Sequence, residues 1–242
     1  MSIIATLIFV VVLALANVLQ AITGFAGAPL SMPICISLAG ISDARASITL
    51  VFLISTAVVA LQNLKVINPK KLATMIFFMV IGMIPGLWLF DRLPTKALML
   101  LYGIIVVLIG FVKLVSKSKN ETPKPLKMVA IVMAGAMQGM FTSGGPFLAL
   151  YATAEMKDKQ EFRATVSSVW AILNIYLCGK MYTQGMYTPN AIRLFLFSII
   201  PVFVAIAIGN RIAKSIKPET FLRLVYILLI VSGGILLLNA LM

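Results

Sequence analysis

The sequence predicts an all-α polytopic membrane protein built from two copies of one unit. Of its 242 residues, 61% are hydrophobic and 11% are charged, whereas soluble domains average about 45–50% apolar and about 25% charged residues. Because about 20 helical residues cross a bilayer core, most of the long runs without charge qualify as membrane spans. These runs cover residues 1–42, 46–64, 72–90, 97–112, 128–154, 164–179, 194–210 and 224–242.

A second observation is an internal duplication. A shift of 118 residues aligns informative positions of the two halves, and the shift later grows to 124, as small loop insertions would make it. Such an ordered series within one chain indicates a repeat. We predict a first transmembrane repeat over 1–112, a basic proline-containing linker over 113–127 and a second repeat over 128–242. The aligned pairs include Gln20 with Gln138, Gly27 with Gly145, Asp43–Ser47 with Glu161–Thr165, Tyr102 with Tyr226 and Gly110 with Gly234.

The net charge of +13 comes from 20 basic residues that are scattered over the loops. In a membrane protein basic loops record topology and suit an anionic lipid surface, so we do not expect nucleic-acid binding. Cys35 and Cys178 lie within apolar runs and are interpreted as small core residues rather than as a disulfide or a metal site.

The loop charges favour an inverted orientation of the repeats. If the first run of each half enters and leaves on one side, as a broken-helix hairpin followed by three full spans, four loops share a side and hold 15 of the 20 basic residues. The positive-inside rule favours this arrangement, with the N-terminus outside. The alternative is eight simple spans in parallel repeats, which splits the basic residues ten to ten. The four loops are 65–71, 113–127, 157–163 and 211–223.

Each half contains a glycine- and proline-rich break, at 20–29 and at 138–146. Irregular backbone at membrane depth is tolerated only where it is buried or lines a cavity. Half-helices that begin near Gly27 and Gly145 would direct free N–H groups and positive dipole ends at an anion near mid-membrane, between the repeats. The alternative is that these glycines only permit close helix packing. The expected substrate-binding residues are Gln20, Thr23, Gly24, Phe25, Gly27, Gln138, Thr142, Ser143, Gly144 and Gly145.

Two arginines, Arg45 and Arg163, each open a helix two residues after an acid. A cation at a helix N-terminus interacts unfavourably with the helix macrodipole. Its presence in both halves therefore suggests that the guanidinium has a role other than stabilising the helix. We add both arginines to the substrate-binding set, as a guanidinium fork for an oxyanion near the cavity mouth. The alternative is a snorkelling arginine that faces the lipid headgroups. Asp43 and Glu161 are interpreted as helix-start partners.

Several functional classes find no support in the sequence. All seven carboxylates lie in or beside loops and there is no histidine, so a buried proton relay, a histidine triad and a histidine metal site are not expected. No phosphate-binding Gly-x-x-x-x-Gly-Lys motif appears. The spans also contain no ring of like charges, which is the feature that would indicate a channel. We therefore expect no enzyme, no cofactor and no metal, and we favour uniport, exchange or a proton carried on the substrate itself.

With these motifs the chain resembles the TauE/SafE family of sulfite exporter-like membrane permeases over essentially its whole length. The resemblance rests on Gly24-Phe25-Ala26-Gly27 with Pro33, Arg45, Thr142-Ser143-Gly144-Gly145-Pro146 and Arg163. It implies a multi-pass transporter of the cell (plasma) membrane that carries sulfite, an organosulfonate or a related organic anion. Ala26, Ala28 and Pro29 depart from the richer glycine run of the family.

Taken together, the sequence predicts a transporter of a small anion bound between the two breaks. The runner-up is a non-transporting membrane scaffold or assembly partner, against which the two hydroxyl-bearing breaks argue. Expected partners are the small anion and the lipid bilayer, and the direction of transport and self-association into a homo-oligomer are left open.

Overall fold

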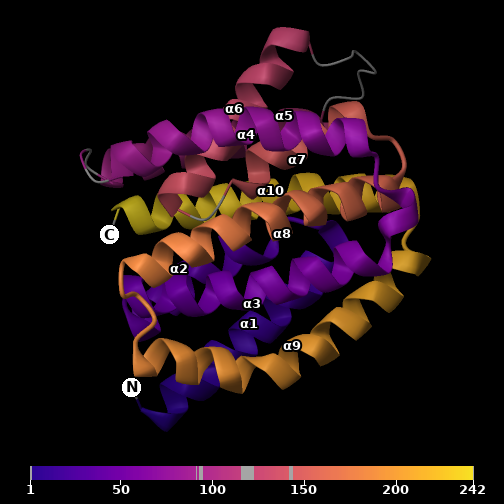
Figure 1. Ribbon diagram of the computed structural model, residues 1–242. Coiled ribbons are helices and arrows are strands. Elements are labelled where there is room, and N and C mark those ends of the chain that lie inside the picture. The colour runs from indigo at the N-terminus through magenta and orange to yellow at the C-terminus, as the bar shows by residue number, and fades with distance from the viewer. Residues whose placement is uncertain (1, 91, 93–94, 116–122, 142–143, 242) are drawn as a thin grey trace. The chain divides into compact units, whose positions relative to one another are not determined.

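The protein is helical throughout the part of the chain that the computed structural model describes, residues 2–90, 92, 95–115, 123–141 and 144–241. Within these residues there are ten α-helices, one short 3-10 helix and no strand (Figure 1). The first half contains α1 (Ile3–Thr23), α2 (Gly27–Ala39), α3 (Ile41–Gln62), the 3-10 helix η1 (Leu64–Val66), α4 (Pro69–Phe90) and α5 (Thr95–Val115). The second half contains α6 (Lys124–Phe141), α7 (Gly145–Glu155), α8 (Lys159–Thr183), α9 (Pro189–Ser215) and α10 (Pro218–Leu241).

Four helices within the described residues are long and apolar enough to cross a membrane. They are α1, the stretch Ser42–Gln62 of α3, the stretch Pro69–Leu89 of α4, and α9. A buried core helix needs no such length, and about 20 apolar residues match the thickness of a bilayer core. The predicted class, an all-α membrane protein, is therefore confirmed.

Both halves follow the same order of elements: a long helix, a break, a short helix and three further helices. The short helices begin at Gly27 and Gly145, as predicted. With 21 residues, α1 extends about 30 Å at 1.5 Å per residue, so it is longer than the half-helix expected. The expected linker is shortened, since α5 continues to Val115 and α6 begins at Lys124, while 116–122 lie outside the described residues.

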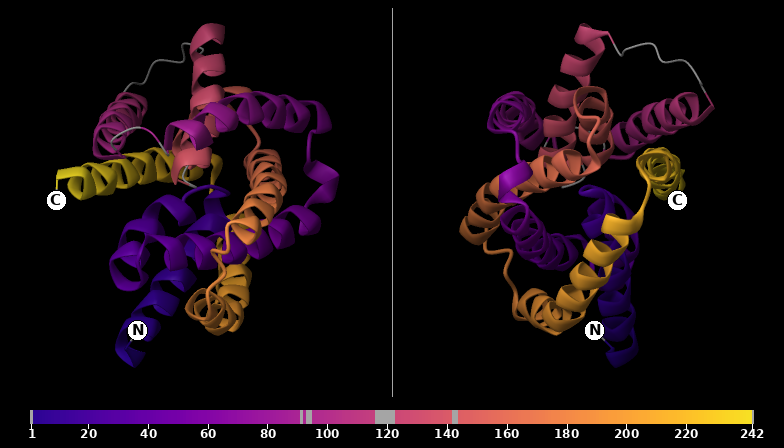
Figure 2. Two further views of the ribbon diagram at one scale, coloured as in Figure 1. Left: turned by 60° about the vertical axis from the view of Figure 1, so that its left-hand side comes forward. Right: turned by 90° about the vertical axis from the view of Figure 1, so that its right-hand side faces the viewer.

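The first compact unit combines α1, α2 and α3 with α9 and most of α8. Within it α1 packs along α9 and against α2 (Figure 2). The helix α1 buries residues at intervals of three or four, which places them on one helical face. This face meets α3 and α9 in an apolar core, to which Phe9, Leu13, Ile48, Phe52 and Leu194 contribute.

The second compact unit contains α4, α5, α6, α7 and α10. Here α4 packs along α6, and α5 along α10. Glycines permit the close approach of α4 and α6: a Cβ atom built on Gly82 or Gly135 would lie under 3.0 Å from backbone of the facing helix. Small residues four apart are a common device for helix contact in membranes. Each unit thus draws helices from both halves of the sequence, and the α1–α9 pair of the first unit corresponds to the α6–α4 pair of the second.

Charged contacts join several helix ends of the second unit. The Lys71 ammonium, at the start of α4, lies 2.8 Å from Glu161 Oε1, at the start of α8. It also donates to the carbonyl oxygen of Glu155. At the start of α6, Lys127 pairs with the Glu155 carboxylate at 2.7 Å, and Lys159 donates to the carbonyl of Ile216 in the turn before α10. Such part-exposed ion pairs add little stability, but they show which helix ends are neighbours in this unit.

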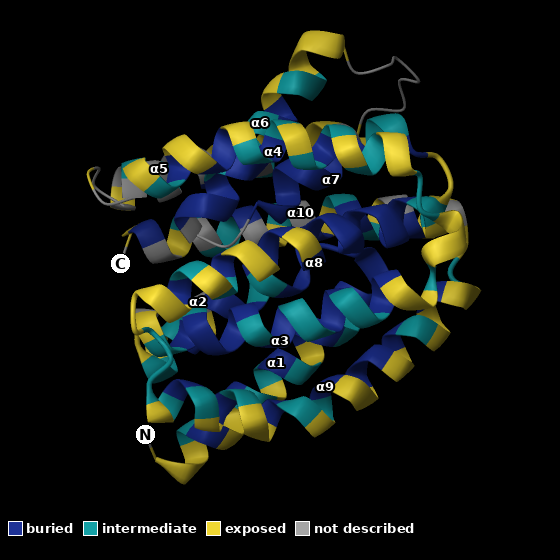
Figure 3. Cartoon of the chain, viewed as in Figure 1, coloured by how far each residue is buried: buried dark blue, intermediate teal, exposed yellow. Residues whose placement is uncertain are grey.

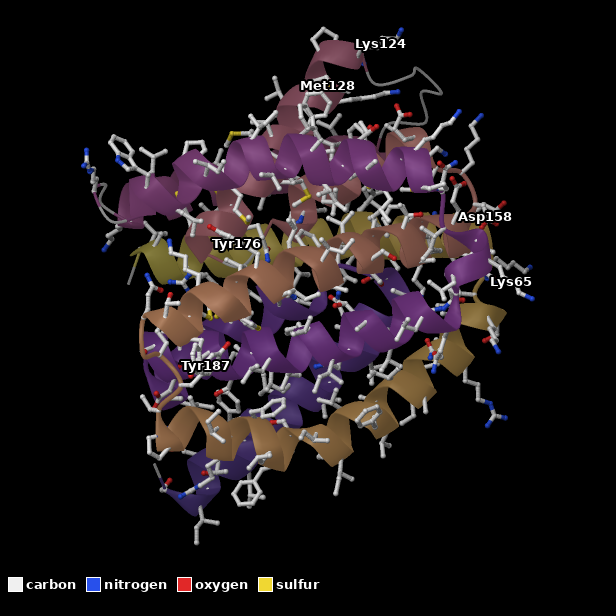
Figure 4. The ribbon with its side chains drawn as sticks, in the orientation of Figure 1. Lys65, Lys124, Met128, Asp158, Tyr176 and Tyr187 are labelled. Atoms are coloured by element: carbon white, nitrogen blue, oxygen red, sulfur yellow. The ribbon has the colours of Figure 1, made fainter. Side chains whose placement is uncertain are left out.

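At one end of the first unit, Asp43 of α3 holds the start of α9. Its two carboxylate oxygens accept hydrogen bonds from Thr188 Oγ1 and Asn190 Nδ2, both at 2.7 Å. Ser47 adds a bond to the carbonyl oxygen of Ala191 at 2.9 Å. Tyr187, in the turn between α8 and α9 (Figure 4), donates to the carbonyl of Cys178. Asp43 and Glu161 thus each lie at a helix start and bind the start of a helix from the other half.

Candidate functional site

The first break is a buried turn closed by its own side chains. Helix α1 ends at Thr23, and the next residue, Gly24, has a φ of 84°, a left-handed conformation that favours glycine. Gln20 spans the break: its Nε2 donates to the carbonyl of Gly24 and its Oε1 accepts from the N–H of Gly27, each at 2.9 Å. Thr23 Oγ1 accepts from the N–H groups of Phe25 and Ala26. The N–H of Gly27 is therefore not free, contrary to the expectation for this helix start.

The second break also has the matching glutamine beside the start of its short helix. Gln138 is buried, and its Oε1 accepts a hydrogen bond from the N–H of Gly144 at 3.2 Å. Helix α7 follows at Gly145, with Pro146 in its first turn, a position that a residue without an N–H suits. Thr142 and Ser143, two of the expected binding residues, lie outside the described residues. The two aligned glutamines thus have one structural task, which is to cap the short helix after the break.

Close packing accounts for part of the glycine pattern. A Cβ atom on Gly27 would lie 2.5 Å from Phe52 Cε1 and 2.8 Å from the carbonyl oxygen of Ala16. On Gly144 it would lie under 3.0 Å from the carbonyl oxygen of Ala134. The packing interpretation of these glycines is therefore supported, and it is compatible with a binding role for the backbone beside them.

Arg163 lies directly against the first break. It is the fifth residue of α8, as Arg45 is the fifth residue of α3. A Cβ atom on Gly24 would lie 3.2 Å from the carbonyl oxygen of Arg163. The guanidinium donates from Nε to the carbonyl of Ala21 and from Nη2 to Asn210 Oδ1.

The Arg163 side chain is 7% exposed, so it is buried rather than directed at headgroups. Its partners are a carbonyl and an amide, and it forms no ion pair with a carboxylate of the described residues. Arg45, in the equivalent place on α3, is half-buried. The structure therefore brings Gln20, Thr23, Gly24 and Arg163 together in the first unit.

Two further residues belong to this arrangement and were missed in the sequence. Asn210 of α9 accepts from Arg163 and donates from Nδ2 to Gln62 Oε1, at the end of α3, at 2.7 Å. Asn210 is the last residue of an uncharged run, which was the only signal available for it. Gln62 lies at the other end of the same chain of bonds, so Asn210 links Arg163 to the end of α3.

Helix α8 is the most polar part of the buried structure. Every residue from Phe162 to Ala171 is buried (Figure 3), and among them are Arg163, Thr165, Ser167 and Ser168. Thr165 accepts from the N–H of Asn68 at the start of α4, and Ser168 donates to the carbonyl of Ala164. Within the described residues, no group of three or more His, Cys, Asp or Glu side chains could hold a metal ion, and Cys35 and Cys178 are free thiols.

The comparisons with known proteins decide the family. A family model described as Sulfite exporter TauE/SafE matches residues 8–236, which is nearly the whole chain. The chain belongs to the TauE/SafE family. The match confirms the resemblance drawn from the motifs, and the family is one of membrane transporters. The Arg163 arrangement and both breaks therefore lie within the matched region of a TauE/SafE protein.

A similarity to one further protein indicates the same class. The chain is 23% identical over 174 residues to a probable inner membrane transporter protein, TsaS, of Comamonas testosteroni. The match covers 71% of this chain and 73% of the relative. No solved structure matches the chain.

Proposed function

We propose that this TauE/SafE protein carries a small anion across the cell membrane and that Arg163 is its main source of positive charge. The observation that carries the proposal is the burial of Arg163 with neutral partners only. A buried charge without an opposite charge is costly in an apolar medium. An anionic substrate supplies the missing charge while it is bound, and intramembrane ionisable groups commonly mark such substrate pathways.

Both breaks contribute to binding in this proposal, one in each repeat. The first break supplies Gln20, Thr23, Gly24, Phe25 and Gly27. The backbone of Arg163 lies against this break at Gly24. The capped N-terminus of α2 keeps its dipole directed at the break, even though the N–H of Gly27 is used internally. By the duplication, the second break supplies Gln138, Thr142, Ser143, Gly144 and Gly145, and Arg45 is the counterpart of Arg163.

We also propose that the two repeats are inverted. In parallel repeats, loop 65–71 and loop 157–163 lie on opposite sides of the membrane, whereas Lys71 and Glu161 form an ion pair in the second unit. Parallel repeats likewise separate the start of α3 from the start of α9, whereas Asp43 binds Thr188 and Asn190 in the first unit. Each unit thus contains a contact that supports the inverted arrangement and opposes the alternative of eight simple spans.

Cysteine labelling tests the orientation of the repeats. In a background with Cys35→Ala and Cys178→Ala, the exposed residues Lys70 and Lys157 are replaced singly by cysteine, and so is Gln184. We expect a membrane-impermeant maleimide on intact cells to label Gln184→Cys only, and permeabilised cells to allow labelling of the other two. Reaction of Lys70→Cys and Lys157→Cys from opposite sides of the membrane would show parallel repeats.

We further propose that the substrate is sulfite, an organosulfonate or a related organic anion, as the family description and the basic site support. A flux assay in proteoliposomes, with sulfite, methanesulfonate and acetate as substrates, tests the proposal. We expect protein-dependent flux of at least one of these acids above that of empty vesicles. Absence of flux for every acid, from vesicles that contain correctly folded protein, would favour the non-transporting scaffold.

A further inference from the structure

Two buried polar atoms on α8 have no hydrogen-bond partner among the described residues: Ser167 Oγ and Trp170 Nε1. Their residues are 1% and 5% exposed. Unpaired polar groups are rare in protein interiors because each costs free energy comparable to a lost hydrogen bond. The neighbouring Ser168 is satisfied by the carbonyl of Ala164, so the lack of partners is not a general property of this helix.

Both residues lie on the same face of α8 as Arg163. Positions 163, 167 and 170 are separated by four and three residues, which places their side chains in one row along the helix. The row begins at the first break, since a Cβ atom on Gly24 would lie 3.6 Å from Ser167 Oγ. A cation and two unused donors therefore follow one another along α8 from the break.

The first repeat has no such pair. The residues 118 positions earlier in the chain are Thr49 and Phe52, on α3. Thr49 donates to the carbonyl of Arg45 at 2.7 Å, and Phe52 has no polar atom in its side chain. At these two positions α3 thus keeps a hydroxyl that is internally bonded and an aromatic ring without a polar atom, whereas Ser167 and Trp170 of α8 both carry a polar atom without an internal partner. The unpartnered Ser55 Oγ of α3 aligns with Leu173 of α8 and so has no counterpart in this row.

Resting on the proposed anion transport, we propose that Ser167 and Trp170 donate hydrogen bonds to the oxygen atoms of the transported anion. The indole N–H can only donate, so its partner must be an acceptor, and an oxyanion next to Arg163 supplies several. Hydrogen bonds from neutral donors to a charged acceptor are stronger than those between neutral groups. In this assignment α8 determines specificity for an oxyanion with at least two oxygens, and the site is asymmetric between the repeats.

The test uses Trp170→Phe and Ser167→Ala in proteoliposomes. Trp170→Phe removes the N–H, keeps an aromatic ring and installs the residue that α3 has at the equivalent position. Each variant is expected to raise the KM for sulfite, or for whichever acid of the panel the wild type carries fastest, by about tenfold, with little change in the maximal rate. The matched control is Ser168→Ala, which removes a neighbouring buried hydroxyl with an internal partner and should leave KM unchanged.

The outcomes separate this inference from the proposed function. A wild-type protein that carries none of the acids removes the proposed function and, with it, the inference. If the wild type transports and the KM of each variant lies within twofold of the wild-type KM, the inference alone is overturned. A rise in KM as large in Ser168→Ala as in Ser167→Ala also overturns it, because it indicates a general effect of removing buried hydroxyls.

A direct binding measurement accompanies the kinetics. In a Trp88→Phe background Trp170 is the only tryptophan left in the chain, so its fluorescence reports on this site. Addition of methanesulfonate to the full-length protein in detergent is expected to shift or quench that emission, and Ser167→Ala is expected to weaken the apparent affinity. A titration that leaves the emission unchanged, with a protein that transports sulfonates, contradicts the contact with Trp170.

Discussion

Replacement of Arg163 by glutamine is expected to reduce the initial rate of anion transport by about 10- to 100-fold, the effect of losing charge-assisted hydrogen bonds. The side chain is the buried cation beside the first break and its neutral partners leave its charge uncompensated. Glutamine keeps a polar head and removes both the charge and the planar fork. The measurement is uptake into proteoliposomes, normalised to the amount of reconstituted protein.

Two variants make this result interpretable. Arg163→Lys keeps the charge and loses the bidentate geometry, so it should retain an intermediate rate. Arg211→Gln removes an exposed arginine of α9 in the same unit and should transport as the wild type does. If Arg163→Gln transports normally while its unfolding temperature is unchanged, Arg163 has no part in anion binding.

Substitution of Gly135 by alanine is expected to destabilise the protein by about 1–3 kcal/mol, the typical cost of overpacking. A Cβ atom there would lie under 3.0 Å from the carbonyl oxygen of Met79 on α4. That oxygen belongs to the backbone, so the two helices must separate to make room. The measurement is thermal unfolding of the purified protein in detergent.

The matched control for this substitution is Gly179→Ala, within helix α8. Nothing lies within 4 Å of a Cβ atom built at Gly179, and alanine is favoured over glycine in a helix interior by up to about 1 kcal/mol. Gly179→Ala should therefore unfold at the wild-type temperature or above it. Equal unfolding temperatures for Gly135→Ala and the wild type would mean that α4 and α6 do not cross as closely as the structure has them.

The helical class and the position of the breaks could be predicted from the sequence because both depend on local properties. Hydropathy over about 20 residues decides whether a helix suits a bilayer, and glycine and proline act on their own stretch of backbone. The helix starts at Gly27 and Gly145 follow from this, as does the equivalent placement of Arg45 and Arg163. The same local reasoning underestimated the length of α1, which runs from Ile3 to Thr23 and is long enough to cross a membrane.

The packing of the helices and the roles of single polar residues could not be predicted in this way. Gln20 was expected to contact substrate, but an amide serves equally to bind a ligand or to bridge a backbone break, and only the geometry shows the second. Asn210 and Trp170 were missed because an isolated polar atom within an apolar run barely changes its hydropathy. The role of Asn210 depends on Arg163, which belongs to another helix. The role of Trp170 depends on the row along α8 that begins beside Gly24, which is distant in the sequence.

The central claim is that the protein carries an anion, and charge discrimination in proteoliposomes tests it most directly. Uptake of methanesulfonate and of acetate is compared with uptake of methanesulfonamide and of acetamide, the neutral amides that have nearly the same size and shape. Buried Arg163, without a carboxylate partner among the described residues, predicts protein-dependent flux of the acid and none of the amide. Equal protein-dependent flux of the two, or no flux of any acid in the panel, would contradict the account.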